Sequence, residues 1–513
     1  MKKKNIIFLV IAIALLLSSV ILLFKYSHAI HYDSDNVSGI LEAHSFMQGN
    51  YLLHSFALSV DNFYLTDLPF YVIYESIAGM NALEISFVPI AIYSLLIIIA
   101  SILVSLNFKD IAIKLKGAIT VIILLGFPSF FLLNTTLTGQ VHVGTILYIL
   151  ISFIFFKLLI SKNQIWYILP LFIFEFIYLL SDPLSIWIGA LPIIITSIIL
   201  LIQKRELVYK YLSIIFITIV NLFLAKILPP FIQSIGGFHL VSPVSYTFAH
   251  LSQIPYKIYL GINSILYYFG AHFLGKKLFL LSTIEELIKA LFILLLIYIL
   301  YKIIKTKKLN IINLLLISAM LLNLLAFIFS NIAKNMSFAR YLMPFTIFAL
   351  IFIAMNIVPL LKKKLFLYIS VIFAIFLIFS FIYRVDHFPE SSNIQNEKAL
   401  VSFLEKHNLS YGIGTYWDSS ITTALSSNKA KVRAILVTEN NIYPLIWLSS
   451  TKWYRHKFNF FVYGNNKYDK ISNDYNLALS MFKNPYKEYM VSGFTVLVYR
   501  KNIDNILLSK NNV

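Results

Sequence analysis

Two aspartates near the amino terminus, Asp33 and Asp35, are the first residues whose type and spacing could do chemistry. In an extended segment, side chains two residues apart point to the same side. Two carboxylates placed in this way could share a divalent cation, or one of them could act as a general base. For an isolated pair of this kind, the alternative is a solvated loop without a site.

Five further polar residues lie close to long apolar segments, where a polar side chain is costly and therefore informative. Asp61 and Asp67 lie among large aromatic residues, so we expect held carboxylates, although Asp67 could instead cap a helix. His142 could be a ligand or an ordinary interface residue, and Asp182 a site residue or a helix cap. Arg340 carries a guanidinium that matches a phosphate, and snorkelling to lipid headgroups is its alternative role.

The composition indicates that these residues belong to a membrane protein. Of the 513 residues, 59% are hydrophobic and 13% are charged, whereas soluble domains have roughly 45–50% apolar and about 25% charged residues. These values exclude an ordinary cytosolic enzyme. The sequence contains no cysteine, which excludes disulfides, thiolate metal sites and cysteine nucleophiles.

Apolar runs of about 17–24 residues predict membrane-spanning helices. The expected fold class is a polytopic α-helical membrane protein with about 11 transmembrane helices. They are expected at about residues 5–24, 83–106, 117–133, 142–160, 164–181, 184–202, 210–229, 284–304, 310–330, 341–361 and 365–384.

The placement of positive charge predicts the orientation of these helices. Lysines and arginines gather at every second connection and at the amino terminus, and cytoplasmic loops are the ones enriched in these residues. The amino terminus is therefore expected in the cytoplasm, and the chain is expected in the plasma (cell) membrane. The net charge of +19 then reflects topology, and no nucleic-acid partner is expected. Residues 1–29 could be a signal peptide, but the alternation of basic loops requires a retained helix.

Three segments outside the spans are long enough to fold. The connections 25–82 and 230–283 contain aromatic-rich stretches, including residues 256–274, that predict helices in the membrane interface. The terminal segment 385–513 predicts a small external α/β domain that follows a transmembrane domain of residues 1–384. Helices are expected over residues 397–407 and 474–482, and strands over residues 432–437, 458–463 and 494–498.

On this topology the candidate residues share the external side of the membrane. The two sides of the membrane are assigned from the placement of lysines alone. The convergence of acids, a histidine and an arginine on one side is therefore independent of any motif. Glu175 lies within a predicted span and could pair with Lys226. An external face with these groups at membrane level is typical of a reaction site.

With these residues in view, the chain resembles the GT-C superfamily, membrane glycosyltransferases that use polyprenyl-phosphate-linked sugars, including protein O-mannosyltransferases. The resemblance covers nearly the whole chain and rests first on one cytoplasmic-to-external helix, followed by a long loop that opens with Asp33-Ser34-Asp35. Short motifs similar to those of an uncharacterised prokaryotic subgroup add to it: residues 48–54, 58–67, 142–145, 181–184, 340–344 and 416–420.

The resemblance implies a GT-C-like fold and a role for each candidate. Asp33 would be the general base or a metal-organising carboxylate, with Asp35 as its neighbour. The lipid phosphate would be contacted by His142 and Arg340. The remaining substrate-binding candidates are Asp61, Asp67 and Asp182. A divalent cation, Mg²⁺ or Mn²⁺, could be held by the first two aspartates, but a lone base would also work.

The resemblance also implies the reaction and the partners. An inverting enzyme would move a sugar from a polyprenyl-phosphate donor to a hydroxyl of a glycan, lipid or protein acceptor on the external face. No signature of the W-W-D-x-G type is present, which favours a monosaccharide donor over transfer of a whole glycan to asparagine. Two alternatives remain open at this point: a transporter or lipid flippase, and a non-catalytic scaffold or receptor.

Overall fold

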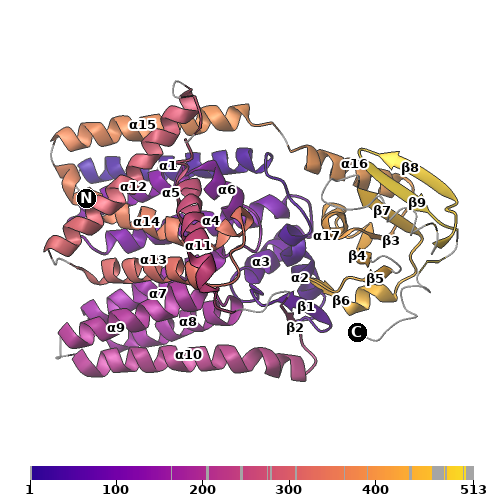
Figure 1. The fold of residues 1–513 in the computed structure, drawn as a ribbon, viewed down its shortest axis with the longest axis horizontal. Helices are drawn as coiled ribbons and strands as arrows, with labels where there is room; N and C mark the ends of the chain where they lie inside the picture. The colour runs from indigo at the N-terminus through magenta and orange to yellow at the C-terminus, as the bar shows by residue number, and fades with distance from the viewer. Residues whose placement is uncertain are drawn as a thin grey trace.

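The computed structural model describes residues 3–503, with gaps at 163, 204–206, 243–246, 274, 278–279, 307–308, 363, 390, 438–441, 465–478, 480–481 and 501. Within this part, long helices form a bundle and a smaller domain built on a sheet lies at one end of it (Figure 1). The amino terminus lies at the opposite end of the bundle from this domain (Figure 1).

The described chain contains eight helices that are long and apolar enough to cross a membrane, or ten if each of two bent pairs is one span. Seven of them include α1 (Lys3–Ser27), α4 (Glu84–Ser105), α7 (Val143–Lys162), α10 (Val208–Ser234), α12 (Leu281–Thr306), α13 (Ile311–Phe329) and α14 (Met343–Ile357). The eighth joins the π-helical turn η3 (Ile186–Ala190) to α9 (Leu191–Gln203). The bent pairs are α5 (Ile111–Gly126) with α6 (Phe130–Thr136), and α15 (Lys364–His387) with α16 (Ser392–Lys406).

The apolar helices support a polytopic helical membrane protein, but three of the eleven predicted spans differ from simple crossing helices. The span predicted at 365–384 lies in α15, which qualifies only together with α16 across a bend of 41°. The span predicted at 117–133 is bent by 85° between α5 and α6. Pro128 disfavours helix in the residue before it, and the Ser129 side chain caps the new helix by accepting a hydrogen bond from the amide of Leu132. The span predicted at 164–181 contains only a short turn, η2 (Ile165–Tyr167), and α8 (Ile168–Ser181). Its 14 helical residues reach about 21 Å, less than the apolar thickness of a bilayer.

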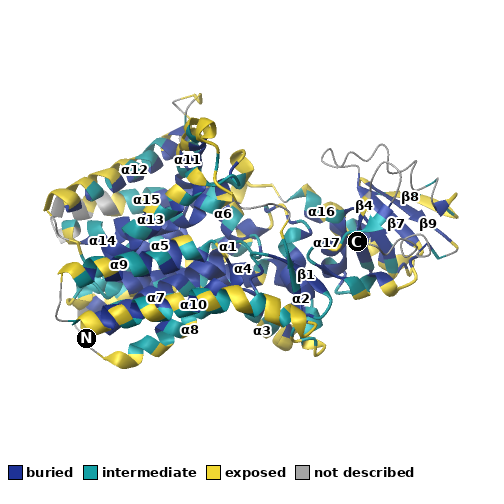
Figure 2. Ribbon diagram, turned by 60° about the horizontal axis from the view of Figure 1, so that its bottom comes forward, coloured by how far each residue is buried: buried dark blue, intermediate teal, exposed yellow. Residues whose placement is uncertain are grey.

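Many residues on the outer faces of the bundle are exposed (Figure 2), and large apolar residues are among them. On α10, for example, Phe216, Ile219 and Phe223 are 66%, 53% and 61% exposed. Soluble proteins rarely expose large apolar patches, so this surface suits contact with lipid. Inside the bundle, Glu175 accepts hydrogen bonds from Thr218 and Asn221. The predicted partner of Glu175, Lys226, is exposed, so that predicted pair is wrong.

The two long connections are folded. The first contains η1 (Asp35–Val37), α2 (Ser38–Met47), strand β1 (Phe56–Ser59) and α3 (Leu68–Ala78). The second contains β2 (His239–Val241), η5 (Leu251–Gln253) and α11 (Ile254–Phe269), which runs across the direction of the long helices in Figure 1. Both segments contain helices, as predicted, and their position in the membrane interface stays a prediction. Helix α11 ends at Gly270, whose φ of +71° closes the helix in a left-handed turn.

A three-stranded sheet joins these connections to the carboxyl-terminal domain. Its order is β2-β1-β6, with β6 at Ser449–Ser450. The central strand β1 pairs in parallel with β2 and antiparallel with β6, with Phe56 opposite Ser450. Segments far apart in the sequence are therefore held together by backbone hydrogen bonds.

The terminal domain is a six-stranded mixed sheet of order β5-β4-β3-β7-β9-β8. Strands β3 (Tyr411–Gly414), β4 (Lys431–Val437) and β7 (Phe460–Gly464) are parallel, and β5 (Ile442–Pro444), β8 (Lys487–Val491) and β9 (Phe494–Val498) pair antiparallel. Helix α17 (Tyr416–Leu425) packs beside β4. The predicted strands and the helix predicted at 397–407 are confirmed, and the helix predicted at 474–482 falls largely outside the described residues.

The orientation predicted from the basic loops can be tested by labelling, because the sequence has no cysteine. We expect a membrane-impermeant maleimide to label Ser402→Cys in intact cells, since Ser402 is an exposed residue of α16. The exposed residue Lys109 lies in a basic loop, so Lys109→Cys should react only after the cells are permeabilised. The reverse labelling pattern would contradict the predicted orientation.

Candidate functional site

A cavity of ≈ 380 Å³ lies where the two long connections, the α6–α7 turn, η6 (Met336–Leu342) and the carboxyl-terminal domain meet. Five of the seven predicted site residues line it: Asp33, Asp35, Asp61, His142 and Arg340. The tertiary structure therefore brings together residues that are up to about three hundred positions apart in the sequence. Asp67 and Asp182 do not line this cavity.

The Asp33–Asp35 pair lies in a turn that leads into η1. Ser34 between them has helical backbone angles, so the predicted extended segment is wrong. The turn forms because Asp33 Oδ1 accepts hydrogen bonds from the amides of Asp35 and Asn36, at 3.0 and 3.4 Å. Burial, together with the charge of Asp35, raises the pKa of Asp33 to about 6. At neutral pH, Asp33 is mostly ionised and well matched to accepting a proton.

The carboxyl-terminal domain holds Asp35 directly. The hydroxyl of Tyr416, the first residue of α17, donates a hydrogen bond to Asp35 Oδ1. Burial raises the pKa of Asp35, and this hydrogen bond opposes the rise. The motif at 416–420 was visible in the sequence, but nothing in its spacing indicated which aspartate it would contact.

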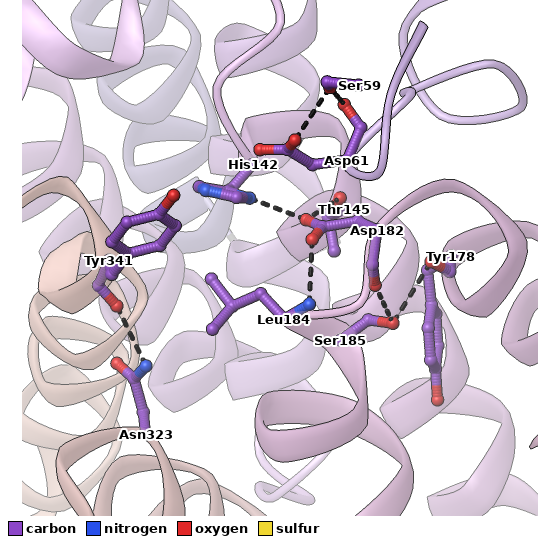
Figure 3. A network of polar contacts seen from close by, with 10 residues as sticks. All are labelled: Ser59, Asp61, His142, Thr145, Tyr178, Asp182, Leu184, Ser185, Asn323 and Tyr341. Atoms are coloured by element: carbon purple, nitrogen blue, oxygen red, sulfur yellow. Dashed lines mark hydrogen bonds and ion pairs between the residues drawn. The ribbon is translucent and has the colours of Figure 1, made fainter. Parts of the chain in front are cut away.

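Asp61 follows β1 and reaches both this cavity and a second one. Its Oδ1 atom accepts a hydrogen bond of 2.7 Å from Ser59, the last residue of β1 (Figure 3). This bond fixes the carboxylate relative to the sheet. As predicted, Asp61 is held rather than solvated.

His142 and Asp182 form a buried pair beside Asp61, drawn in Figure 3. The imidazole Nδ1 lies 2.7 Å from Asp182 Oδ2, which also accepts a hydrogen bond of 2.8 Å from Thr145. Burial alone would lower the pKa of His142, but the negative charge of Asp182 outweighs it and raises this pKa above the usual value. Asp182 Oδ1 also accepts from the amide of Leu184, so Asp182 both caps the following turn and orients the histidine.

Arg340 belongs to η6, the turn before α14, and its exposed side chain faces the cavity. The guanidinium lies 5.5 Å from the ring centroid of Tyr341, a cation–π distance. It also interacts electrostatically with Asp61 and Asp35. The cavity thus contains a positive charge among its carboxylates.

Four residues in the cavity wall have backbone angles that side chains rarely adopt. Phe63, Gln140, His142 and Leu448 have φ of +50°, +53°, +50° and +49°. Each such conformation costs on the order of 1–3 kcal/mol, and residues that adopt one tend to cluster at functional sites. The strain was not visible in the sequence, since none of the four residues is glycine.

Asp67 is buried away from the cavity, so its predicted role in substrate binding is not supported by its position. It occupies the N-cap position of α3 without a side-chain cap bond, and its Oδ2 atom has no hydrogen-bond partner in the described structure. Burial raises the pKa of Asp67 to about 7. The carboxyl group packs against Gly144 of α7, where an added Cβ would lie 2.4 Å from Oδ2.

Residues other than the seven predicted site residues also line the cavity. Glu42 is buried and accepts a hydrogen bond of 3.2 Å from Gln140, and burial raises its pKa to about 8. Trp447 of the carboxyl-terminal domain and the pair Tyr267 and Tyr268 of α11 add aromatic rings to the wall. The charge of Glu42 was visible in the sequence, but its inward direction depends on the packing of α2.

A second, mainly apolar cavity of ≈ 440 Å³ adjoins the first. Asp61 and His142 line both cavities. Much of the wall comes from α13, and Phe248, another lining residue, is 84% exposed. Other lining residues are Asp182, Leu184, Trp187, Leu325, Phe329 and Tyr341. A polar chamber and an apolar chamber therefore meet at a carboxylate and a histidine.

The donor atoms around Asp33 and Asp35 bear on the predicted metal ion. Within the described ranges, no three histidine, cysteine, aspartate or glutamate side chains are grouped as metal ligands. The Oδ1 atoms of both aspartates already accept hydrogen bonds. A site for Mg²⁺ or Mn²⁺ would need ligands from elsewhere, for example a bound phosphate, and it stays a prediction.

The contact between Gly144 and Asp67 can be tested by substitution. Gly144→Ala would bring a methyl group against the Asp67 carboxyl, so we expect it to lower stability by about 1–3 kcal/mol. Gly261→Ala in α11 is the control, because its Cβ would meet only side-chain atoms at 3.5 Å or more. It should be neutral or stabilising by about 0.5–1 kcal/mol. Thermal unfolding of the two variants in detergent measures the difference, and equal effects would contradict the assigned packing.

Comparison with known proteins does not place the chain in a family. No protein-family model matches the sequence, and no curated protein matches it. The two adjoining cavities and the groups at their junction are therefore the basis on which we infer a function.

Proposed function

We propose that the protein is a membrane glycosyltransferase with a GT-C-like fold, which moves a sugar from a polyprenyl-phosphate donor to an acceptor hydroxyl on the external face. One observation carries the proposal: an apolar cavity and a carboxylate-lined polar cavity meet at Asp61 and His142. Such a donor has the same division, with an apolar chain on one side of its phosphate and a polar sugar on the other.

In this proposal, the lipid chain of the donor occupies the apolar cavity and its sugar enters the polar one. The phosphate between them lies close to His142 and Arg340. Asp182 accepts from Nδ1 of the imidazole, so the protonated ring, which the charge of Asp182 favours, can donate from Nε2 to the phosphate. Together the two basic side chains offset the charge of Asp61 and stabilise the charge that develops on the leaving phosphate.

Asp33 is the proposed general base. It accepts the proton of the acceptor hydroxyl as the acceptor oxygen attacks the anomeric carbon. The bond from that carbon to the phosphate oxygen breaks, and the lipid phosphate leaves with the electron pair. Because a single displacement occurs, the anomeric configuration inverts. A divalent cation on Asp33 and Asp35, if one binds, would contribute charge neutralisation at the phosphate.

The proposed location is the plasma membrane, with the amino terminus in the cytoplasm and the carboxyl-terminal domain outside. The positions of the two ends of the chain support it, because the amino terminus and the domain lie at opposite ends of the bundle (Figure 1). The donor can then reach the apolar cavity laterally from the lipid, while the acceptor arrives from the aqueous side.

Removing the proposed base should abolish transfer but leave donor binding intact. We expect Asp33→Asn to lower the turnover number by about 10²- to 10⁴-fold, the contribution of a general base. The assay is sugar release from radiolabelled polyprenyl-phosphate hexoses by the purified protein in lipid, with membrane extract as the acceptor source. Asp386→Asn is the control, since Asp386 pairs with Lys25 away from the cavity. No release from any donor by the wild-type protein would overturn the proposal and favour transport.

Arg340 should contribute to donor binding through its charge. We expect Arg340→Gln to weaken binding of polyprenyl phosphate by about 10- to 100-fold, because a charge-assisted hydrogen bond is lost. Arg340→Lys should restore part of the affinity. Arg455→Gln, at an exposed position outside the cavity, is the control. Unchanged binding in Arg340→Gln, measured by equilibrium binding in nanodiscs, would remove Arg340 from the phosphate site.

A further inference from the structure

One wall of the polar cavity is built by the carboxyl-terminal domain. Trp447 and Leu448 line the cavity directly before β6. Pairing of β6 with β1 fixes this segment, and the amide of Thr451 adds a hydrogen bond of 3.0 Å to the carbonyl of Ser55. The positive φ of Leu448 is therefore a conformation that the surrounding pairing imposes.

Trp447 is fixed at its polar edge as well. Its side chain interacts with that of Tyr416, whose hydroxyl donates a hydrogen bond to Asp35. The start of α17 is itself anchored on the first external connection, because Ser34 donates to the carbonyl of Trp417 at 3.1 Å and accepts from the amide of Ser420 at 3.0 Å. A half-buried indole ring is thus held next to the aspartate pair.

The rest of this cavity is rich in side chains that hydrogen-bond to hydroxyl groups. Neutral amides and hydroxyls alternate with the carboxylates in its lining, and they belong to Asn36, Ser38, Ser59, Asn134, Thr135 and Gln140. An aromatic face beside carboxylates and amides suits a pyranose ring, whose C–H face is apolar and whose edge carries hydroxyls.

We propose that Trp447 forms the acceptor subsite and that the acceptor is a carbohydrate, an inference that rests on the proposed glycosyl transfer. Stacked on Trp447, an acceptor sugar can direct one hydroxyl at Asp33, which takes the proton as the oxygen bonds to the anomeric carbon and the phosphate departs. An extended peptide is a poorer fit. Such peptides add to open strand edges, whereas β1, which reaches the cavity through Ser59, is paired on both sides.

The test compares two tryptophans of the full-length protein in nanodiscs. Trp447→Ala should raise the KM for an oligosaccharide acceptor by about 3- to 10-fold, the loss of one stacking contact. Trp447→Phe should recover most of the loss. Trp417→Ala is the matched control, because Trp417 is 40% exposed and does not line the cavity. The probes are trisaccharides of glucose, mannose, galactose and N-acetylglucosamine, and a serine- and threonine-containing peptide.

A binding measurement separates this inference from the proposed function. Quenching of intrinsic tryptophan fluorescence by a trisaccharide should occur in the wild-type protein and in Trp417→Ala, and it should be lost in Trp447→Phe. Such quenching without transfer from any donor would uphold the carbohydrate subsite and overturn the proposed function. Transfer that Trp447→Ala does not impair, binding of the peptide alone, or no quenching by any trisaccharide would overturn the subsite.

Discussion

The cavity depends on the pairing of a single short strand along both of its edges. All four residues of β1 are buried, and buried backbone amides and carbonyls need hydrogen-bond partners. Those partners come from the second long connection through β2 and from the carboxyl-terminal domain through β6. The same bonds hold Asp61, just beyond β1, opposite Trp447, just before β6. Through this sheet, both long connections and the terminal domain are joined by backbone hydrogen bonds.

Three aspartates of the cavity are each fixed by a separate set of hydrogen bonds. Asp33 is held by backbone amides of its own turn, Asp35 by Tyr416, and Asp61 by Ser59. The bonds to Asp33 and Asp35 oppose the rise in pKa that burial of these two carboxyl groups causes. Arg340 and the protonated form of His142 offset part of the charge. In the proposed transfer, such a chamber would need little reorganisation when charge moves from an attacking oxygen to a phosphate.

The strained residues of the cavity wall are held in place by contacts with other segments of the chain. Gln140 and His142 lie in the turn between α6 and α7, and Leu448 precedes β6. Such angles persist only where neighbouring contacts impose them, here the Asp182 bond to His142 and the strand at Ser449. The strain therefore places side chains where an unconstrained loop would not.

The sequence by itself determined the membrane class, most helix positions, the strands of the terminal domain and the set of polar residues on one side. These properties follow from local patterns, because apolar length and period are read residue by residue. Tertiary structure decided which of those polar residues meet. It placed Asp67 against Gly144 and outside the cavity, turned Asp33 and Asp35 into a capped turn, and brought in Glu42, Tyr416 and Trp447. Such contacts depend on packing between segments that lie far apart in the sequence. No local pattern of residues in a single sequence indicates which of these segments will meet.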